Sequence, residues 1–191
     1  PELAHPQIVA GSHAILKADA IRFVATFRQF LDTASFPNLL LQLAQFLLMK
    51  DHTVIQTYAA HAIDKVLQMK EQQQQVGHAP PPVVTTQAFA PCATTILPTV
   101  CQQLAHTAVP NEYLMKCLMT MMRVHPSTII PYIGQVMHSL GDVLIFQMKN
   151  PSNPVYNHCL WECISRGIKM APENVTDIEV LLWEKLMFIL R

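Results

Sequence analysis

The chain has 191 residues, of which 51% are hydrophobic and only 14% are charged. Its length supports a sizeable core in one or two domains, and a charged fraction well below the roughly 25% of average proteins indicates that helix contacts cover much of the surface. Thirteen basic residues balance thirteen acidic ones, so the field that attracts nucleic acid or an anionic membrane is missing, and we expect no direct nucleic-acid binding.

Apolar residues recur at helical spacing along almost the whole chain, and the alternation typical of half-buried strands is scarcely seen. The pattern therefore predicts an all-α protein. We expect helices at residues 13–32, 37–50, 52–70, 88–108, 111–125, 127–149, 154–170 and 175–190. Asn153 and Pro154 form a typical helix start. Pro98 and Pro131 lie inside apolar helical patterns, and each should kink its helix or mark its first turn.

The expected helices group into pairs. Their starts recur about every 40 to 50 residues, the period of HEAT and armadillo arrays, which predicts an α-solenoid of HEAT-type repeats. A helical bundle is the alternative, because helix count alone does not separate a bundle from a stack. We interpret residues 1–191 as a single repeat segment with a lone second helix at 13–32, pairs at 37–70, 88–125 and 127–170, and the first helix of another repeat at 175–191.

The segment 71–87 interrupts this order with the tracts Gln72 to Gln75 and Pro80 to Pro82. Such residues bury little and favour extended backbone, so we expect a flexible loop between repeats. A polyproline ligand is the alternative, but no PxxP context accompanies the three prolines. The chain opens at Pro1 and ends within VLLWEKLMFIL, so we expect further repeats beyond both ends.

Three features bear on location. The longest apolar stretch is interrupted by Gln42 and Gln45, and no signal peptide is visible, so we expect an intracellular protein without membrane insertion. Five cysteines, an odd number, lie in helical patterns without CxxC spacing, which indicates free buried thiols in a reducing compartment. The Asn174-Val-Thr176 sequon is interpreted as chance.

The sequence lacks the residue patterns that are usual in catalytic and metal-binding sites. Cys159 and Cys163 lie one helical turn apart beside His158, but a closed zinc site needs about four ligands and no second pair accompanies them. No Ser/His/Asp or Cys/His arrangement can be tied together by spacing, and none of the five glycines forms a phosphate-binding loop. We expect no enzyme activity, no metal and no cofactor.

Each expected second helix carries a polar line opposite its apolar face. The lone opening helix offers Asp19, Arg22, Thr26 and Gln29, and the line on 111–125 includes Thr120. Stacked second helices usually line the concave side of a solenoid, so these lines predict a mixed-charge surface suited to protein partners. The alternative is a solvated face with i,i+4 pairs such as Glu112 and Lys116. The candidate protein-binding residues are Asp64, Lys65, Lys116, Arg123, His158, Glu162, Arg166 and Lys169.

Five segments, in order, resemble CAS-type exportins of the importin-β superfamily. They are LKADAIRFVATFR (16–28), VIQTYAAHAIDKVLQM (54–69), NEYLMKCLM (111–119), IIPYIGQV (129–136) and KNPSNPVYNHCLWECI (149–164). TYAAHA and KNPSNPVYNH are more specific than a generic HEAT pattern, and the resemblance is weakest from Glu71 to Val109.

The resemblance implies a HEAT-repeat transport receptor that binds importin-α together with Ran in its GTP form. Such a receptor carries importin-α through the nuclear pore, meets nuclear pore proteins, shuttles between nucleus and cytoplasm, and hydrolyses nothing itself. On this interpretation the candidate surface contributes to binding Ran or importin-α. A HEAT scaffold that arranges other proteins without Ran is the competing interpretation, because composition and periodicity fit it equally well.

Overall fold

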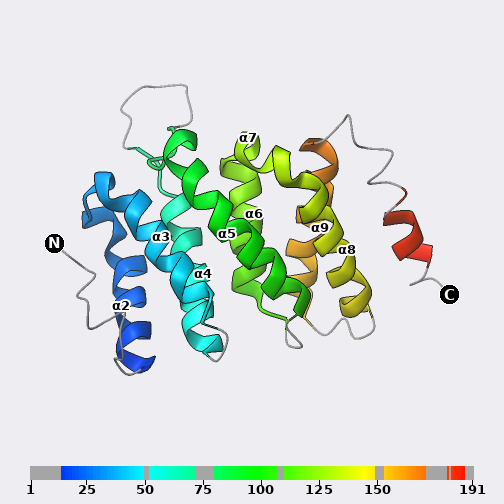
Figure 1. The fold of residues 1–191 in the computed structure, drawn as a ribbon, viewed down its shortest axis with the longest axis horizontal. Coiled ribbons are helices and arrows are strands. Elements are labelled where there is room, and N and C mark those ends of the chain that lie inside the picture. The colour runs from blue at the N-terminus through cyan, green and yellow to red at the C-terminus, as the bar shows by residue number, and fades with distance from the viewer. Residues whose placement is uncertain are drawn as a thin grey trace. The chain divides into compact units, whose positions relative to one another are not determined.

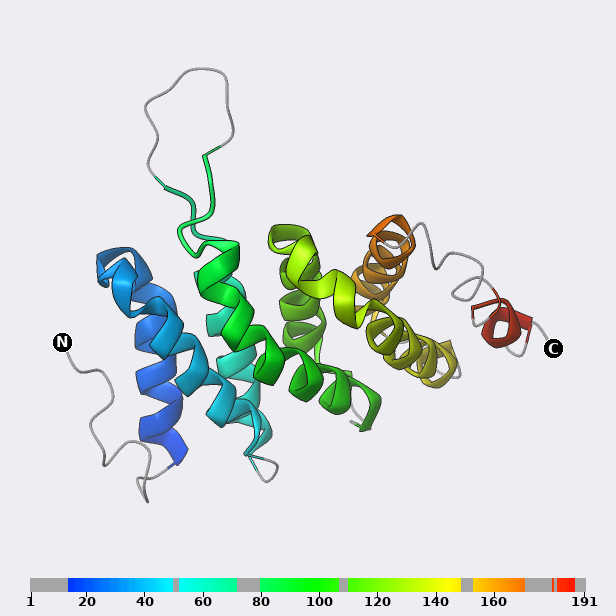
Figure 2. The ribbon, with the colours of Figure 1, turned by 45° about the horizontal axis from the view of Figure 1, so that its top comes forward.

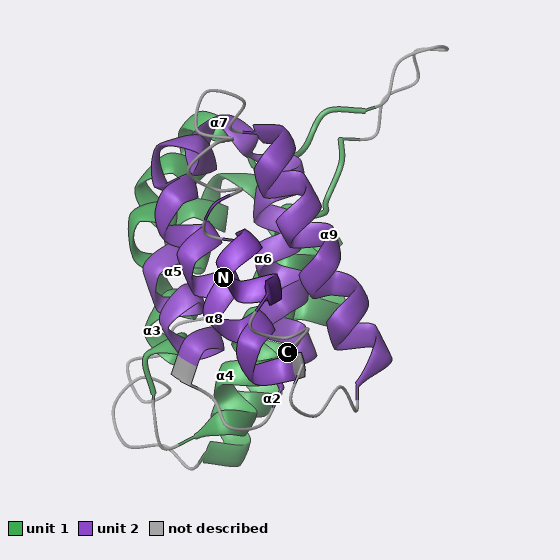
Figure 3. Cartoon of the chain, turned by 90° about the vertical axis from the view of Figure 1, so that its right-hand side faces the viewer, with its two compact units in different colours: residues 1–96 green, residues 97–191 purple. Residues whose placement is uncertain are grey.

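The computed structural model describes residues 14–49, 52–71, 80–106, 110–148, 153–170, 180 and 182–187. Within these ranges every named element is a helix (Figure 1), and the one β-type contact is an isolated bridge between Lys70 and Pro82. The all-α prediction is confirmed. The chain divides into two compact units, Pro1–Ile96 and Leu97–Arg191 (Figure 3), and each is described by itself.

The first unit is built around a central helix that packs against two others. Its elements are α2 (Ala14–Phe27), η1 (Arg28–Phe30), η2 (Thr33–Ser35), α3 (Phe36–Leu47), α4 (Thr53–Leu67) and the first half of α5 (Thr86–His106). Helix α4 packs against both α2 and α3 (Figure 2). Buried Gln56 stabilises the turn between α3 and α4, because its Nε2 donates to the Leu47 carbonyl at 3.2 Å.

The two ends of the connection between α4 and α5 are joined to each other by backbone hydrogen bonds. The Glu71 amide donates to the Pro81 carbonyl and the Val83 amide to the Met69 carbonyl, both at 2.9 Å. Residues 72–79 of the expected loop lie outside the described residues. The described flanks are therefore two antiparallel extended segments, and α5 starts at Thr86.

The second unit repeats the pattern of the first. Its elements are the second half of α5, α6 (Glu112–Val124), α7 (Pro126–Ile129), η3 (Ile130–Tyr132), α8 (Ile133–Met148), α9 (Pro154–Met170) and helical residues 182–187. Helix α9 packs against α8, which precedes it in the chain, and against α6. In each unit, a second helix thus contacts its own first helix and the second helix of the adjoining repeat.

This contact pattern is that of a HEAT-type α-solenoid, in which repeats stack on their neighbours, and differs from a closed bundle around one core. The predicted fold class is confirmed. The division into the repeats 37–70, 88–125 and 127–170 stays a proposal, which these contacts support.

Local sequence explains where the helices start and break. Asn111 Oδ1 accepts from the amides of Tyr113 at 3.1 Å and Leu114 at 3.4 Å, and Asn153 caps α9 in the same way ahead of Pro154, as predicted. Pro131 lies in η3, the 3₁₀ turn between α7 and α8, so the expected local break occurs there. Helix α5 runs across Pro98 without a change of helix type.

The stretch 126–147 is long and apolar enough to cross a membrane by length and composition alone. Many of its apolar side chains are buried within the second unit, among them Ile129, Ile133, Val136 and Leu140, each at most 2% exposed, while Ile130 and Phe146 are 45% and 52% exposed. That burial is typical of a core helix in a packed domain.

Two buried positions join the helices of the second unit closely. A Cβ added at Gly167 of α9 would overlap Sδ of Met137 on α8, so the absence of a side chain at Gly167 lets the two helices approach. His125, at 0% exposure, links α6 to α7. Its amide donates to the Met121 carbonyl at 3.0 Å, its carbonyl accepts from Thr128 at 3.1 Å, and burial lowers the pKa of its imidazole from 6.5 to about 4.

Candidate protein-interaction surface

Helices α6 and α9 pack side by side in the second unit and run parallel, because the antiparallel α8 separates them in the chain (Figure 1). Together they hold most of the sequence-predicted site. Six of these residues lie exposed or half-buried on the two helices: Lys116, Arg123, His158, Glu162, Arg166 and Lys169. The structure thus brings these six onto two neighbouring helices.

Two of the α9 side chains form an ion pair along the helix. Arg166 Nη2 donates to Glu162 Oε1 at 2.7 Å, and the two side chains are 31% and 41% exposed. The hydrogen bond from Arg166 and then its charge hold the pKa of the Glu162 carboxyl below its usual value, with smaller contributions from His158 and Lys169. The Glu162 charge is therefore largely compensated by its own helix.

The α6 line is organised in the same way. Lys116 Nζ lies 3.2 Å from Glu112 Oε1 and 5.4 Å from the ring centroid of Tyr113. The ion pair contributes roughly 0.2 to 0.5 kcal/mol to the helix at such an i,i+4 position, and the ring adds a weak cation–π attraction. The Lys116 ammonium is thus held in place on α6.

Arg123 and Lys169 differ from these paired residues. Both are exposed in the last turn of their helices, and neither forms an ion pair with any residue that the structure describes. Since Glu112 and Glu162 are paired within their own helices, these two cations give the α6–α9 face its uncompensated positive charge.

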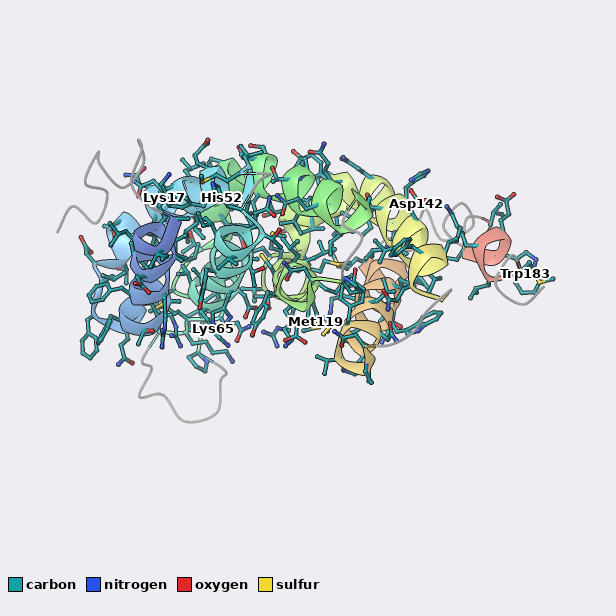
Figure 4. All side chains as sticks on the ribbon, turned by 90° about the horizontal axis from the view of Figure 1, so that it is seen from below. Lys17, His52, Lys65, Met119, Asp142 and Trp183 are labelled. Atoms are coloured by element: carbon teal, nitrogen blue, oxygen red, sulfur yellow. The ribbon has the colours of Figure 1, made fainter. Side chains whose placement is uncertain are left out.

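In the first unit, the structure departs from the predicted polar line at one position. Asp64 is only 4% exposed, and its Oδ1 accepts from Gln68 Nε2 at 2.5 Å within α4. Lys65, with 36% of its side chain exposed and its Nζ 3.8 Å from Asp64 Oδ2, projects from α4 on the side away from α3 (Figure 4). The expectation that Asp64 lies on an open face with Lys65 is therefore wrong.

The same departure occurs at Thr120, which is 0% exposed on α6. A second helix contacts a neighbour on more than one side, so the part of its circumference that stays open is narrower than the polar line suggests. The predicted polar residues of the opening helix, by contrast, are all exposed: Asp19, Arg22 and Thr26 on α2 and Gln29 on η1.

Sequence reasoning missed the exposed aromatic side chains. Trp161 on α9 is 41% exposed beside Glu162. Phe23 and Phe27 on α2 have ring centroids 4.6 Å apart, and Phe30 follows at 6.5 Å from Phe27. The α2 signal was present, since each of the first two phenylalanines directly follows a residue of the polar line and so lies about 100° around the helix from it.

The five cysteines are part of the buried core. None of the five is in a disulfide and all are buried, and burial raises the pKa of Cys101 to about 11 and that of Cys163 further still, helped by nearby Cys159. Reactive thiols need a lowered pKa and access to solvent. Across the described ranges, no three His, Cys, Asp or Glu side chains gather as a metal site requires.

Paired helices whose second members pack on one another, with polar lines on those second members, define a segment of a HEAT-type α-solenoid. A family profile described as "CAS/CSE protein, C-terminus" matches residues 64–191, and one described as "Cse1" matches residues 2–63. The chain belongs to the CAS/CSE family.

The curated relatives are named Exportin-2. That of Oreochromis niloticus is 33% identical over 191 residues, which cover 96% of this chain and 18% of the relative. That of Drosophila melanogaster is 32% identical over 89% of this chain and 17% of its own length, and that of Homo sapiens is 29% identical over 88% and 17%. The chain thus spans less than a fifth of the length of these relatives.

Proposed function

We propose that this chain is part of a nuclear export receptor, an exportin, that binds importin-α together with Ran in its GTP form and carries it from nucleus to cytoplasm. The observation that carries the proposal is the 33% identity to an Exportin-2 across 96% of the chain. The receptor would shuttle through the nuclear pore, contact nuclear pore proteins there, and catalyse nothing itself.

The proposed binding surface is the polar face of the second helices, in particular His158, Glu162, Arg166 and Lys169 on α9 and Lys116 on α6. Their support is local: they are accessible, and two of the cations are held by ion pairs at 2.7 Å and 3.2 Å. A pre-positioned charge loses less side-chain freedom when a partner binds. Lys65 belongs to the proposal as an accessible residue of α4, whereas Asp64 does not.

Cooperation between the two partners has a physical basis in this architecture. A solenoid in which repeats contact only their neighbours can change curvature by small adjustments at many interfaces. Two partners that favour the same curvature each lower the cost of binding the other, and a coupling of about 1 to 3 kcal/mol corresponds to roughly 5- to 150-fold cooperativity.

The test is a chimera in which this chain replaces the matched segment of the Oreochromis niloticus Exportin-2. We expect immobilised importin-α to retain the chimera with GTP-loaded Ran and not with GDP-loaded Ran. A chimera with native helical content that retains importin-α equally with either nucleotide form, or not at all, contradicts the proposal and favours a scaffold unrelated to Ran.

Charge reversal in the same chimera tests the surface. Arg166→Glu with Lys169→Glu should weaken assembly of the ternary complex, because both changes replace a cation of the proposed surface with an anion. The control reverses an exposed cation of the first unit that lies outside the polar lines, Lys70→Glu, and should assemble normally. Unchanged affinity for both partners in the Arg166/Lys169 variant contradicts the placement of the surface.

A further inference from the structure

Three second helices have a basic residue in the last turn, whereas α2, which is also interpreted as a second helix, has none. The last turns of α4, α6 and α9 contain Lys65, Arg123 and Lys169 respectively. The last turns of the first helices α3 and α8 contain no basic residue. Two of these three helices, α6 and α9, pack against each other.

The helix dipole favours a cation near the C-terminus of any helix, by roughly 0.3 to 1 kcal/mol. The cations of α6 and α9 differ from the others because these two helices pack against each other and both side chains are exposed. They can therefore act together on one bound segment.

In the second unit this edge has a defined geometry. Because α6 and α9 are parallel and packed together, their last turns lie at the same end (Figure 1). Packed helices have axes about 8 to 10 Å apart. Arg123 and Lys169, each one residue before the end of its helix, are exposed there and form no ion pair with a described residue.

We propose that Arg123 and Lys169 form a docking edge for an extended acidic segment of a protein partner. This proposal rests on the proposed function, in which the second helices bind protein, and adds the chemistry of the bound segment. In polyproline II conformation, residues i and i+3 point the same way and lie about 9 Å apart, a spacing within the general range of axis separations for packed helices. Carboxylates at every third position of the segment can therefore meet both cations.

Charge favours an acidic protein segment over a polyphosphate. The whole chain has no net charge, so it lacks the long-range field that attracts a densely charged nucleic acid. A segment with widely spaced carboxylates can place its charges on the cations and leave uncharged residues beside Glu112 and Glu162.

The experiment measures fluorescence anisotropy of labelled peptides with the complete 191-residue chain at about 20 mM salt, where screening is weak. The probe is four copies of Glu-Pro-Ser, and the reference is four copies of Gln-Pro-Ser. We expect the glutamate peptide to bind about 5-fold more tightly, the scale of two exposed ion pairs. A peptide of equal composition with its four glutamates contiguous should bind more weakly than the spaced one.

Variants locate the binding. Arg123→Gln with Lys169→Gln should abolish the preference for glutamate, whereas Lys70→Gln, which removes an exposed cation outside the polar lines, should preserve it. Arg123→Glu with Lys169→Glu should instead prefer a Lys-Pro-Ser peptide.

Several results would overturn the docking edge. They are equal binding of glutamate and glutamine peptides, a preference that survives Arg123→Gln with Lys169→Gln, and tighter binding of a short single-stranded RNA than of the peptide. Lower thermal stability of that variant with unchanged peptide preference would assign the cations to the helix dipole. If these peptide tests fail while the chimera retains importin-α with GTP-loaded Ran, the docking edge is wrong and the proposed function stands.

Discussion

His125 provides a prediction about acid stability that follows from its burial. The imidazole is fully buried between α6 and α7, and its pKa is lowered from 6.5 to about 4. The folded state therefore favours the neutral ring, and the stabilising effect is fully present above pH 6.5 and is lost as pH falls toward 4. Each unit of pKa difference corresponds to 1.36 kcal/mol, so linkage gives a loss of about 2 kcal/mol at pH 5 and about 3 kcal/mol at pH 4.

The assay is the free energy of unfolding of the second unit from urea titrations between pH 7.5 and pH 4, with His125→Gln as the comparison. The glutamine does not titrate, so the stability difference between the two proteins should shrink or change sign as the pH falls. His52→Gln, at an exposed position, should leave the pH dependence almost unchanged. Parallel curves for wild type and His125→Gln, or an NMR titration of His125 with a midpoint near 6.5, would refute the reasoning.

Three further predictions concern packing, capping and reactivity. Gly167→Ala should destabilise the protein by about 1 to 3 kcal/mol through overpacking against buried Met137, and a second change, Met137→Ala, should cost less in that background than alone. Gly134→Ala, where an added Cβ meets nothing within 4 Å, should instead stabilise α8 by about 0.5 to 1 kcal/mol. Urea titrations measure the single variants and the double variant, and equal losses for the two glycine replacements would contradict the close helix contact. Asn111→Ala should cost about 1 kcal/mol by removing the cap of α6, with Asn111→Ser retaining most of the stability in the same titration. Cys163 should resist alkylation by iodoacetamide at pH 8 in the native protein and react after denaturation, as mass spectrometry of the labelled peptide can show; rapid native labelling would mean that its burial and raised pKa are not maintained.

The helices were accessible to sequence reasoning because their determinants are local. On α9, Tyr156, Cys159, Leu160 and Cys163 are buried at the i, i+3, i+4 and i+7 spacing of an apolar helix face. Asn111 could be recognised as a cap since its partners are amides only two and three residues away.

The candidate site could be predicted only in part. The helical register of Glu162 and Arg166 was enough to place them together, because i and i+4 are neighbours on any helix. Register did not reveal that Asp64 and Thr120 are buried, or that Trp161 remains 41% exposed. Each of those outcomes depends on which side of the helix an adjoining helix covers.

Local sequence was enough to predict most of the described helices and the cap at Asn153, since these depend on contacts within one or two turns. The accessibility of each polar side chain, the contact of Gly167 with Met137 and the shared edge of α6 and α9 became apparent only in the packed structure. Accessibility and close approach are set by pairs of residues far apart in the chain, and no local pattern specifies the side from which a neighbouring helix packs.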